Sequence, residues 1–209
     1  MHEQAMAWLK HQFADRTLGT VVEIGSYNHN GSAREALEHN SMSWTGIDII
    51  SGPNVDYVCN IMDTDELDDF QSSLDMPYFD TVVSTEVLEH VTAKEMIEAM
   101  LQLVDPDFHS KQFIITCANA KRKPHSADGG ELKPNEHYCG LNAGEVIALF
   151  DTAIQQDTSF VNSYVEYHAY HNPESHDTYV HVVIGYDTSL AKYFLSKGTY
   201  YDYVRQYNS

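Results

Sequence analysis

Apolar runs and amphipathic segments alternate along the chain, and this alternation predicts its secondary structure. Seven runs have the length and composition of strands; they cover residues 20–25, 44–49, 55–59, 79–84, 112–117, 163–169 and 179–186. Apolar residues at helical spacing predict helices in five segments; these are residues 1–17, 31–40, 64–75, 92–104 and 142–155. In the first helix we expect one buried face, formed by Ala5, Trp8, Leu9 and Phe13.

Two of these helices begin with capping signals. Thr92 precedes the fourth helix, and Glu95 stands where it would complete a capping box. Asn142 is a candidate cap for the fifth helix.

The order of elements predicts the fold class. Strands that alternate with helices form a mostly parallel sheet covered on both faces. The last two runs differ, because they alternate polar and apolar residues around HNPESHD, where Asn172 and Pro173 start a turn. They therefore predict an antiparallel hairpin. We expect a single domain over residues 1–209, with a lid loop at 118–141 and a tyrosine-rich tail at 188–209.

The loop after the first strand, in VVEIGSYNHNGSARE, is a candidate ligand site. Gly25 permits a sharp turn and Gly31 a close approach to the next helix. The loop is no Walker loop, and Tyr27 and His29 occupy positions that would crowd a pyrophosphate. Asp48 ends the second strand, where a carboxylate can hold both hydroxyls of a ribose. A nucleoside ligand fits these residues better than a bare phosphate.

Several stretches resemble the motifs of one family. EIGSYNHNGSARE, TGIDIISGPNVDYVCN and FDTVVSTEVLEHV are similar, in this order, to motifs of class I S-adenosylmethionine-dependent methyltransferases, in their small single-domain branch. The resemblance covers roughly residues 18–117. It implies a doubly wound, Rossmann-like three-layer α/β fold, whose seven-stranded sheet is mostly parallel with an antiparallel C-terminal hairpin strand. It also implies S-adenosylmethionine as cofactor and S-adenosylhomocysteine as product.

The resemblance also implies which residues surround the cofactor, from its methionine end to its ribose and adenine. These are Glu23, Gly25, Ser26, Asn30, Gly31, Asp48, Ile49, Asn60, Ile61 and Thr85. Two features depart from the common pattern. Tyr27 and His29 stand where the first motif usually has glycines, and Asn60 stands where the third often has aspartate.

Methyl transfer to a hydroxyl or amine also requires removal of a proton. Glu86 and His90 are four residues apart, so a helical start would place them on one face. The alternative for Glu89 and His90 is a structural role at the turn. In the lid loop the candidates are His125, Glu136, His137 and Tyr138. Of these, His137 is the predicted base or substrate contact.

A metal site is not expected from the sequence. Four histidines lie in or near the terminal hairpin, at positions 168, 171, 176 and 181, but nothing in their spacing indicates a tetrahedral arrangement.

The charge of the chain limits its partners. The net charge of −19 disfavours binding to nucleic acid. The basic cluster Lys121-Arg122-Lys123, with Lys133 nearby, is either a solvated loop or a small anion site. Three cysteines without a CxxC motif suit a cytoplasmic setting, and no segment is apolar enough to enter a membrane.

We therefore expect a methyltransferase that acts on a small molecule, a sugar or a protein. A SAM-binding module without catalysis and a nucleotide-dependent oxidoreductase are the alternatives.

Overall fold

The computed structural model describes residues 3–29, 31–105, 110–160, 163–185 and 201–206, the last of these as backbone only. One eight-stranded sheet runs through it in the order β3-β2-β1-β4-β5-β7-β6-β8. The strands are β1 (Gly19–Ile24), β2 (Ser41–Asp48), β3 (Tyr57–Val58), β4 (Thr81–Thr85), β5 (Ser110–Ala118), β6 (Tyr164–Asn172), β7 (Asp177–Gly185) and β8 (Tyr201–Gln206). The pairs from β3 to β5 are parallel, and those involving β6, β7 and β8 are antiparallel.

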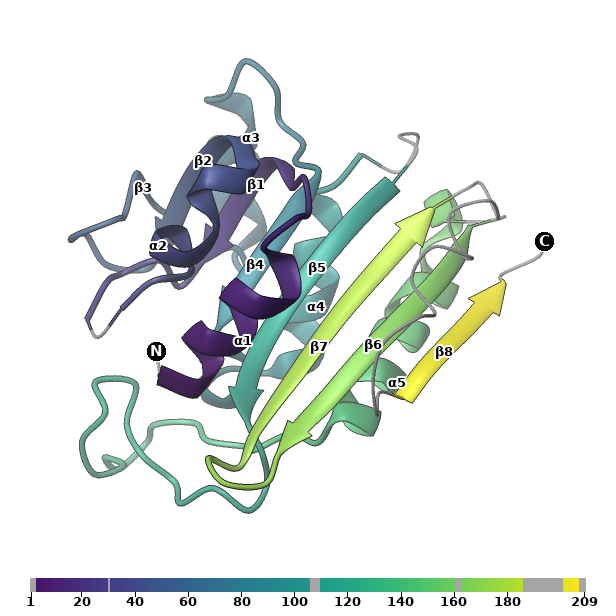
Figure 1. The fold of residues 1–209 in the computed structure, drawn as a ribbon. Helices are drawn as coiled ribbons and strands as arrows, with labels where there is room; N and C mark the ends of the chain where they lie inside the picture. Colours follow the sequence, from purple (N-terminus) through teal and green to yellow (C-terminus); the bar gives the residue numbers. More distant parts are fainter. Residues whose placement is uncertain (1–2, 30, 106–109, 161–162, 186–200, 207–209) are drawn as a thin grey trace.

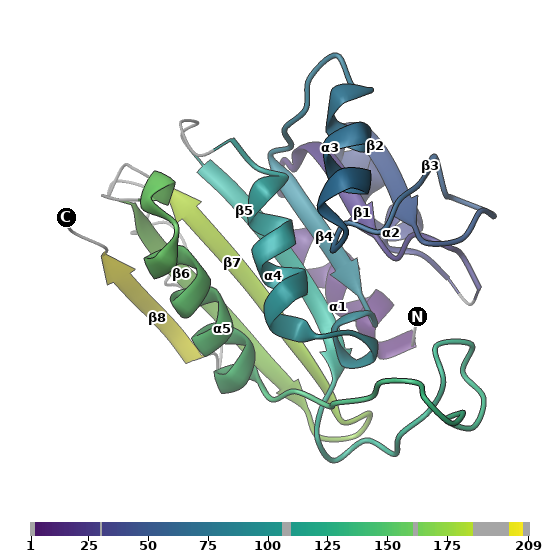
Figure 2. The ribbon, with the colours of Figure 1, turned by 180° about the vertical axis from the view of Figure 1, so that it is seen from behind.

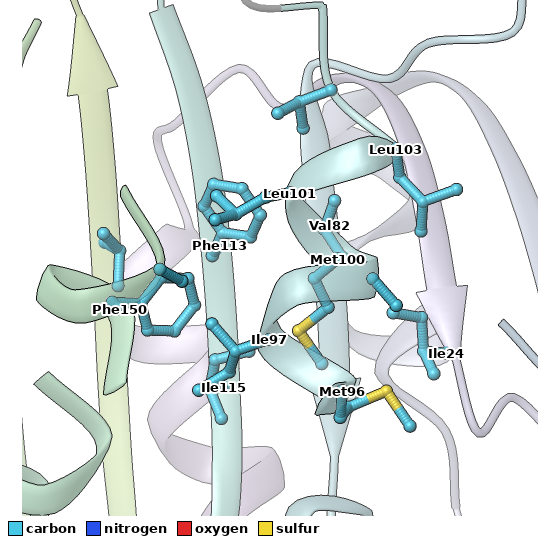
Figure 3. Close-up of a cluster of buried hydrophobic side chains, with 14 of the residues drawn as sticks. Ile24, Val82, Met96, Ile97, Met100, Leu101, Leu103, Phe113, Ile115 and Phe150 are labelled. Carbon is cyan, nitrogen blue, oxygen red and sulfur yellow. The ribbon is translucent and has the colours of Figure 1, made fainter. Parts of the chain in front are cut away.

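Helices cover both faces of this sheet, as Figures 1 and 2 show from opposite sides. The α-helices are α1 (Glu3–Phe13), α2 (Ala33–Leu37), α3 (Thr64–Ser72), α4 (Ala93–Gln102) and α5 (Ala143–Gln156). On one face, α1 and α2 pack in a core that includes Leu9, Phe13 and Leu37. On the other face, Ile97 and Leu101 of α4 and Phe150 of α5 pack in a second core, in which the Phe150 ring contacts Phe113 of β5 (Figure 3). The predicted three-layer α/β fold is confirmed.

Seven of the strands correspond to the seven predicted apolar runs, and the terminal hairpin is antiparallel as expected. The sheet also has an eighth strand, β8, which lies in the tyrosine-rich tail and pairs with β6. Residues 188–200 and 207–209 of that tail lie outside the described residues. The predicted helix at 31–40 is shorter, because α2 ends at Leu37 and a 3₁₀ turn, Glu38–Asn40, follows it.

The two predicted caps differ in outcome. Asn142 caps α5 in a complete capping box, in which its side chain accepts from the Glu145 amide and the Glu145 carboxylate accepts from the Asn142 amide. Thr92 occupies the N-cap position of α4, but its side chain makes no capping hydrogen bond. The predicted box at Thr92 and Glu95 is therefore wrong.

The first helix has the predicted buried face. Ala5, Leu9 and Phe13 are buried, and the Trp8 ring stacks on Tyr179 with their centroids 4.9 Å apart. Packing of α1 on the sheet thus contributes its own hydrophobic cluster on this face.

All three cysteines are free; Cys59 and Cys117 are buried, and Cys139 is exposed. Among the helices of the described residues, none has the length and apolar character needed to cross a membrane. The cytoplasmic setting stays a prediction.

Candidate functional site

A cleft of about 1620 Å³ lies at the carboxyl ends of β1, β2 and β4. Ile24, Asp48 and Thr85 mark these three strand ends in its lining. The other wall is the lid loop that follows β5, from Arg122 to Lys133, together with Glu136. Figure 1 shows this teal loop running past the end of β5, near the N-terminal end of α1. The long loop thus lines the cleft at this edge of the sheet, and its role as a substrate lid stays a prediction.

Gly25 makes the turn that opens the cleft. Its φ of 72° is left-handed, and a Cβ added there would lie 2.3 Å from Cγ2 of Val87. The Gly25 amide donates to the carbonyl oxygen of Ile47 at 2.9 Å, which ties the turn to β2. Only glycine satisfies both the backbone angle and the close approach.

The unusual residues of this loop pack against the β2–β3 connection. A Cβ on Gly52 would lie 2.0 Å from the Tyr27 ring, so the ring rests directly on that glycine. The Tyr27 amide donates to Asp48 Oδ2 at 3.1 Å, and the Asn28 amide to the carbonyl oxygen of Pro53 at 3.0 Å. Tyr27 therefore takes the place of a glycine without closing the cleft.

Glu23 is buried beneath the loop, and the protein itself occupies its carboxylate. The Ala33 amide donates to Oε1 and the Trp44 indole to Oε2, both at 3.0 Å. Ser32 Oγ lies 3.4 Å from each oxygen. Burial raises the pKa of Glu23 to about 7, although these hydrogen bonds oppose the shift. The side chain links β1, β2 and the start of α2.

The structure brings the predicted cofactor residues together. Nine of them line the cleft: Glu23, Gly25, Ser26, Gly31, Asp48, Ile49, Asn60, Ile61 and Thr85. Asn30 lies outside the described residues. Besides the Tyr27 amide, Asp48 accepts from the Ile50 amide at 3.2 Å. Their roles toward a cofactor stay predictions.

Glu86 follows β4 in the left-handed region, with φ of 60°. A residue other than glycine is strained at such a backbone angle, and strained residues cluster at functional sites. The Arg122 guanidinium is 2.6 Å from Glu86 Oε2 and 2.9 Å from Asp177 Oδ1, and Thr116 Oγ1 donates to Glu86 Oε1 at 2.9 Å. These contacts hold the carboxylate at the cleft wall.

The predicted helical alignment of Glu86 with His90 is wrong. Residues Leu88–His90 form a separate 3₁₀ turn, α4 begins at Ala93, and the backbone of Glu86 is not helical. Both side chains nevertheless line the same cleft.

A cluster next to Glu86 is formed by Glu89, His90, His125 and Tyr138. Glu89 is fully buried, and its Oε1 accepts from the Ala118 amide at 3.1 Å. Burial and the charge of Glu86 raise the pKa of Glu89 to about 8, and burial lowers the pKa of His90 to about 4. The three rings meet edge to face, with His90 and His125 centroids 5.2 Å apart. The structural role considered for Glu89 has support, whereas His90 faces the cleft.

His137 is exposed and is not among the residues that line the cleft, whereas Glu86 and His90 both line it. The lid instead presents His125. Which histidine faces inward depends on how the loop folds, and the sequence carries no periodic signal there.

The basic cluster is no simple anion site, because its central residue is an ion-pair partner. The side chain of Arg122 is only 14% exposed and bridges Glu86 and Asp177. Lys133 pairs with Asp128 at 2.6 Å. The sequence of the basic cluster indicated its positive charge. It did not indicate the acidic partner Asp177, because this residue lies 55 residues beyond Arg122 in the chain.

Among the described residues, the side chains close enough to share a metal ion are Glu89, His90 and His125. They do not include the four histidines considered from the sequence. His168 and His181 instead stack across β6 and β7, and His171 stacks on His176.

No protein-family model matches the sequence, and no curated protein sequence matches it significantly. The fold does match solved structures. One is the 1,6-didemethyltoxoflavin-N1-methyltransferase of Burkholderia thailandensis, solved with 1,6-didemethyltoxoflavin and S-adenosylhomocysteine; the match covers 88% of this chain and 76% of that chain, at 16% identity and a TM-score of 0.52. Another is a SAM-dependent methyltransferase from Archaeoglobus fulgidus, at 85% and 94% coverage, 12% identity and a TM-score of 0.53.

The chain has the class I methyltransferase fold. Identities this low show the fold alone. The same fold also matches the [4+2]-cyclase SpnF, over 87% of this chain and 79% of that chain, at 11% identity and a TM-score of 0.52. Because one fold hosts different reactions, the activity has to be argued from the cleft.

Proposed function

We propose that this protein is a SAM-dependent methyltransferase. The observation that carries the proposal is one continuous cleft, lined at one end by Gly25 and Asp48 and at the other by Glu86, His90 and the lid. Its volume of about 1620 Å³ exceeds the roughly 300–1,000 Å³ of a typical single-ligand pocket. A methyl donor and an acceptor would thus share one space.

The residues at the first end fit S-adenosylmethionine. Asp48 offers a carboxylate at the end of β2, where ribose hydroxyls bind in folds of this kind. The neighbouring Ile49 is 69% exposed, so its side chain offers an uncovered apolar surface for a flat base. Gly25 leaves the backbone open beside them.

The second end fits an acceptor that carries no negative charge. On this side of the cleft, the lining carboxylates of Glu86, Asp128, Glu131 and Glu136 outnumber the basic side chains of Arg122, Lys123 and Lys133. A phosphorylated acceptor would meet net repulsion there. We infer a neutral or cationic acceptor, and the depth of the lid-covered cleft favours a small molecule over a protein.

Bound S-adenosylmethionine would supply an electrophilic methyl group, and the chain would align the acceptor and exclude water. The lid is suited to this task because its own side chains hold it together. Ser126 Oγ donates to Glu136 Oε1 at 2.8 Å, and the Lys133 amide donates to Glu136 Oε2 at 2.8 Å.

Ligand-induced stabilisation tests the first half of this proposal. S-Adenosylhomocysteine at about 100 times its Kd should add roughly 2.7 kcal/mol of unfolding free energy. The melting temperature should then rise by roughly 5–10 °C for a chain of this size. Asp48→Ala should lose the rise, and Asp68→Asn, at an exposed position on α3, should keep it. No shift with either SAM ligand would contradict the proposal, and a shift with NAD alone would favour an oxidoreductase.

Methyl transfer needs a separate test. The protein would be incubated with methyl-labelled S-adenosylmethionine and either the small-molecule or the protein fraction of a cell extract. Label transferred by the wild type but not by Asp48→Ala would support an enzyme and identify the acceptor class. Ligand binding without transfer to either fraction would favour a SAM-binding module.

A further inference from the structure

A group of potential metal ligands lies where the 3₁₀ turn after β4 meets the lid. Glu89 and His90 come from the turn and His125 from the lid. One possible ligand atom of each lies within 4.8 Å of the others. We propose that these three side chains bind one divalent cation, with Zn²⁺ as the best match.

The ligand types select the ion. Two imidazoles and one carboxylate make the set found in catalytic zinc sites, which keep a fourth position for water or substrate. Imidazole ligands suit Zn²⁺, whereas Mg²⁺ and Ca²⁺ take mostly oxygen. The set therefore favours zinc over magnesium.

The hydrogen bond of His125 leaves the correct nitrogen available. Its Nδ1 lies 3.2 Å from the carbonyl oxygen of Lys123. A carbonyl only accepts, so Nδ1 carries the proton and donates, and Nε2 keeps its lone pair. Metal-binding histidines commonly have this arrangement, in which a backbone carbonyl orients the ring from behind.

Glu89 offers a buried oxygen as a ligand atom. The side chain is fully buried; the Ala118 amide donates to Oε1, but Oε2 has no hydrogen-bond partner among the described residues. Buried polar atoms in native proteins are almost always paired. A cation bound by Glu89 would also offset the negative charge of the neighbouring Glu86.

The proposed ion would face the cleft, because His90 and His125 both line it. Ligand atoms around tetrahedral Zn²⁺ lie about 3.4 Å apart, given metal–ligand distances near 2.1 Å. The three ligand atoms, which all lie within 4.8 Å of one another, are therefore close to the spacing that a bound ion requires. The open position could polarise an acceptor oxygen. This role rests on the proposed methyltransferase function, but metal binding itself does not.

Direct metal binding tests the inference. The full-length protein would be stripped with a chelator and titrated with Zn²⁺ by calorimetry, and with Co²⁺ by visible absorption, which reports coordination by the protein. We expect one tight equivalent in the wild type. His90→Ala and His125→Ala should each weaken it at least tenfold, whereas His137→Ala, on the same loop but outside the cleft, should keep it.

Far-UV circular dichroism would check that each variant is folded, and His125→Gln would repeat the test with a polar side chain at the same position. Absence of a tight equivalent in the wild type, or one that survives replacement of both histidines, would overturn the inference. The titration requires no SAM ligand. A negative result here is therefore distinguishable from failure of the S-adenosylhomocysteine experiment.

Discussion

At the scale of single residues, Gly25 meets two requirements, a left-handed backbone angle and a close approach to Val87. Comparison with a second glycine can separate their contributions to stability. The left-handed φ of 72° at Gly25 disfavours any side chain, and Val87 occupies the space that a Cβ would need. Gly129, in the lid, has a similar φ of 82° but nothing within 4 Å of an added Cβ. It is therefore a matched control for the backbone term alone.

We expect Gly25→Ala to lower the free energy of unfolding by about 2–4 kcal/mol, from backbone strain and overpacking together. Gly129→Ala should cost only about 1 kcal/mol. Urea unfolding of both variants measures the difference. Equal losses would show that Val87 moves aside freely and that the close approach contributes little.

At the scale of elements, the capping hydrogen bonds distinguish two helices whose starts look alike in the sequence. Asn142 forms a reciprocal box with Glu145 at α5, whereas Thr92 makes no side-chain capping bond at α4. We expect Asn142→Ala to cost about 1 kcal/mol of unfolding free energy and Thr92→Ala only a few tenths. Urea unfolding compares the two, and a larger loss for Thr92→Ala would contradict the assignment.

The same scale shows which elements the sequence could predict. Apolar runs and helical periodicity report local burial, and they predicted seven strands and all five α-helices. β8 was missed because its tyrosine-rich segment lacks a clear alternation, and its pairing with β6 is a long-range contact. Of the two predicted caps, the one at Asn142 forms and the one at Thr92 does not. Residue type permits a capping hydrogen bond, but the local backbone decides whether it forms.

At the scale of the whole molecule, the sequence predicted the part of the site that follows the strand ends. It did not predict the part that the lid forms. Gly25, Asp48 and Thr85 are placed by the sheet, so their spacing along the chain was informative. Arg122 and His125 reach the cleft through a loop without periodicity. Their partners come from distant segments, as the contact of Arg122 with Asp177 shows.

Among the groups whose pKa links the stability of the whole molecule to pH, the buried side chains of Glu23 and His181 respond in opposite directions. Glu23 has a pKa raised to about 7, so the folded state binds a proton that the unfolded state lacks between pH 4.5 and 7. Falling pH therefore stabilises the fold through Glu23. His181 is fully buried on β7, and burial, with the nearby charge of Arg16, lowers its pKa well below 6.5. Below pH 6.5 only its unfolded form binds a proton, so falling pH destabilises the fold.

Because the two effects oppose each other, the pH dependence of the wild type alone would hide both, and a variant is needed to separate them. The His181 ring pairs through Nε2 with Gln112 Oε1 at 3.1 Å; around it lie Arg16, next to α1, and His168 on β6, itself 3.6 Å from Glu166. His181→Gln keeps a donor for Gln112 but removes the titration.

We expect the wild type to be more stable than His181→Gln at pH 7.5, and this advantage to shrink as the pH falls from 6.5 to 5. The change can reach about 1.4 kcal/mol per pH unit, the limit for one proton. Unfolding free energies from urea titrations across this range give the difference directly, since Glu23 contributes equally to both proteins. A difference that stays constant with pH would mean that His181 takes up its proton in the folded state, and that the packing of Phe13 on its ring does not exclude the charged form.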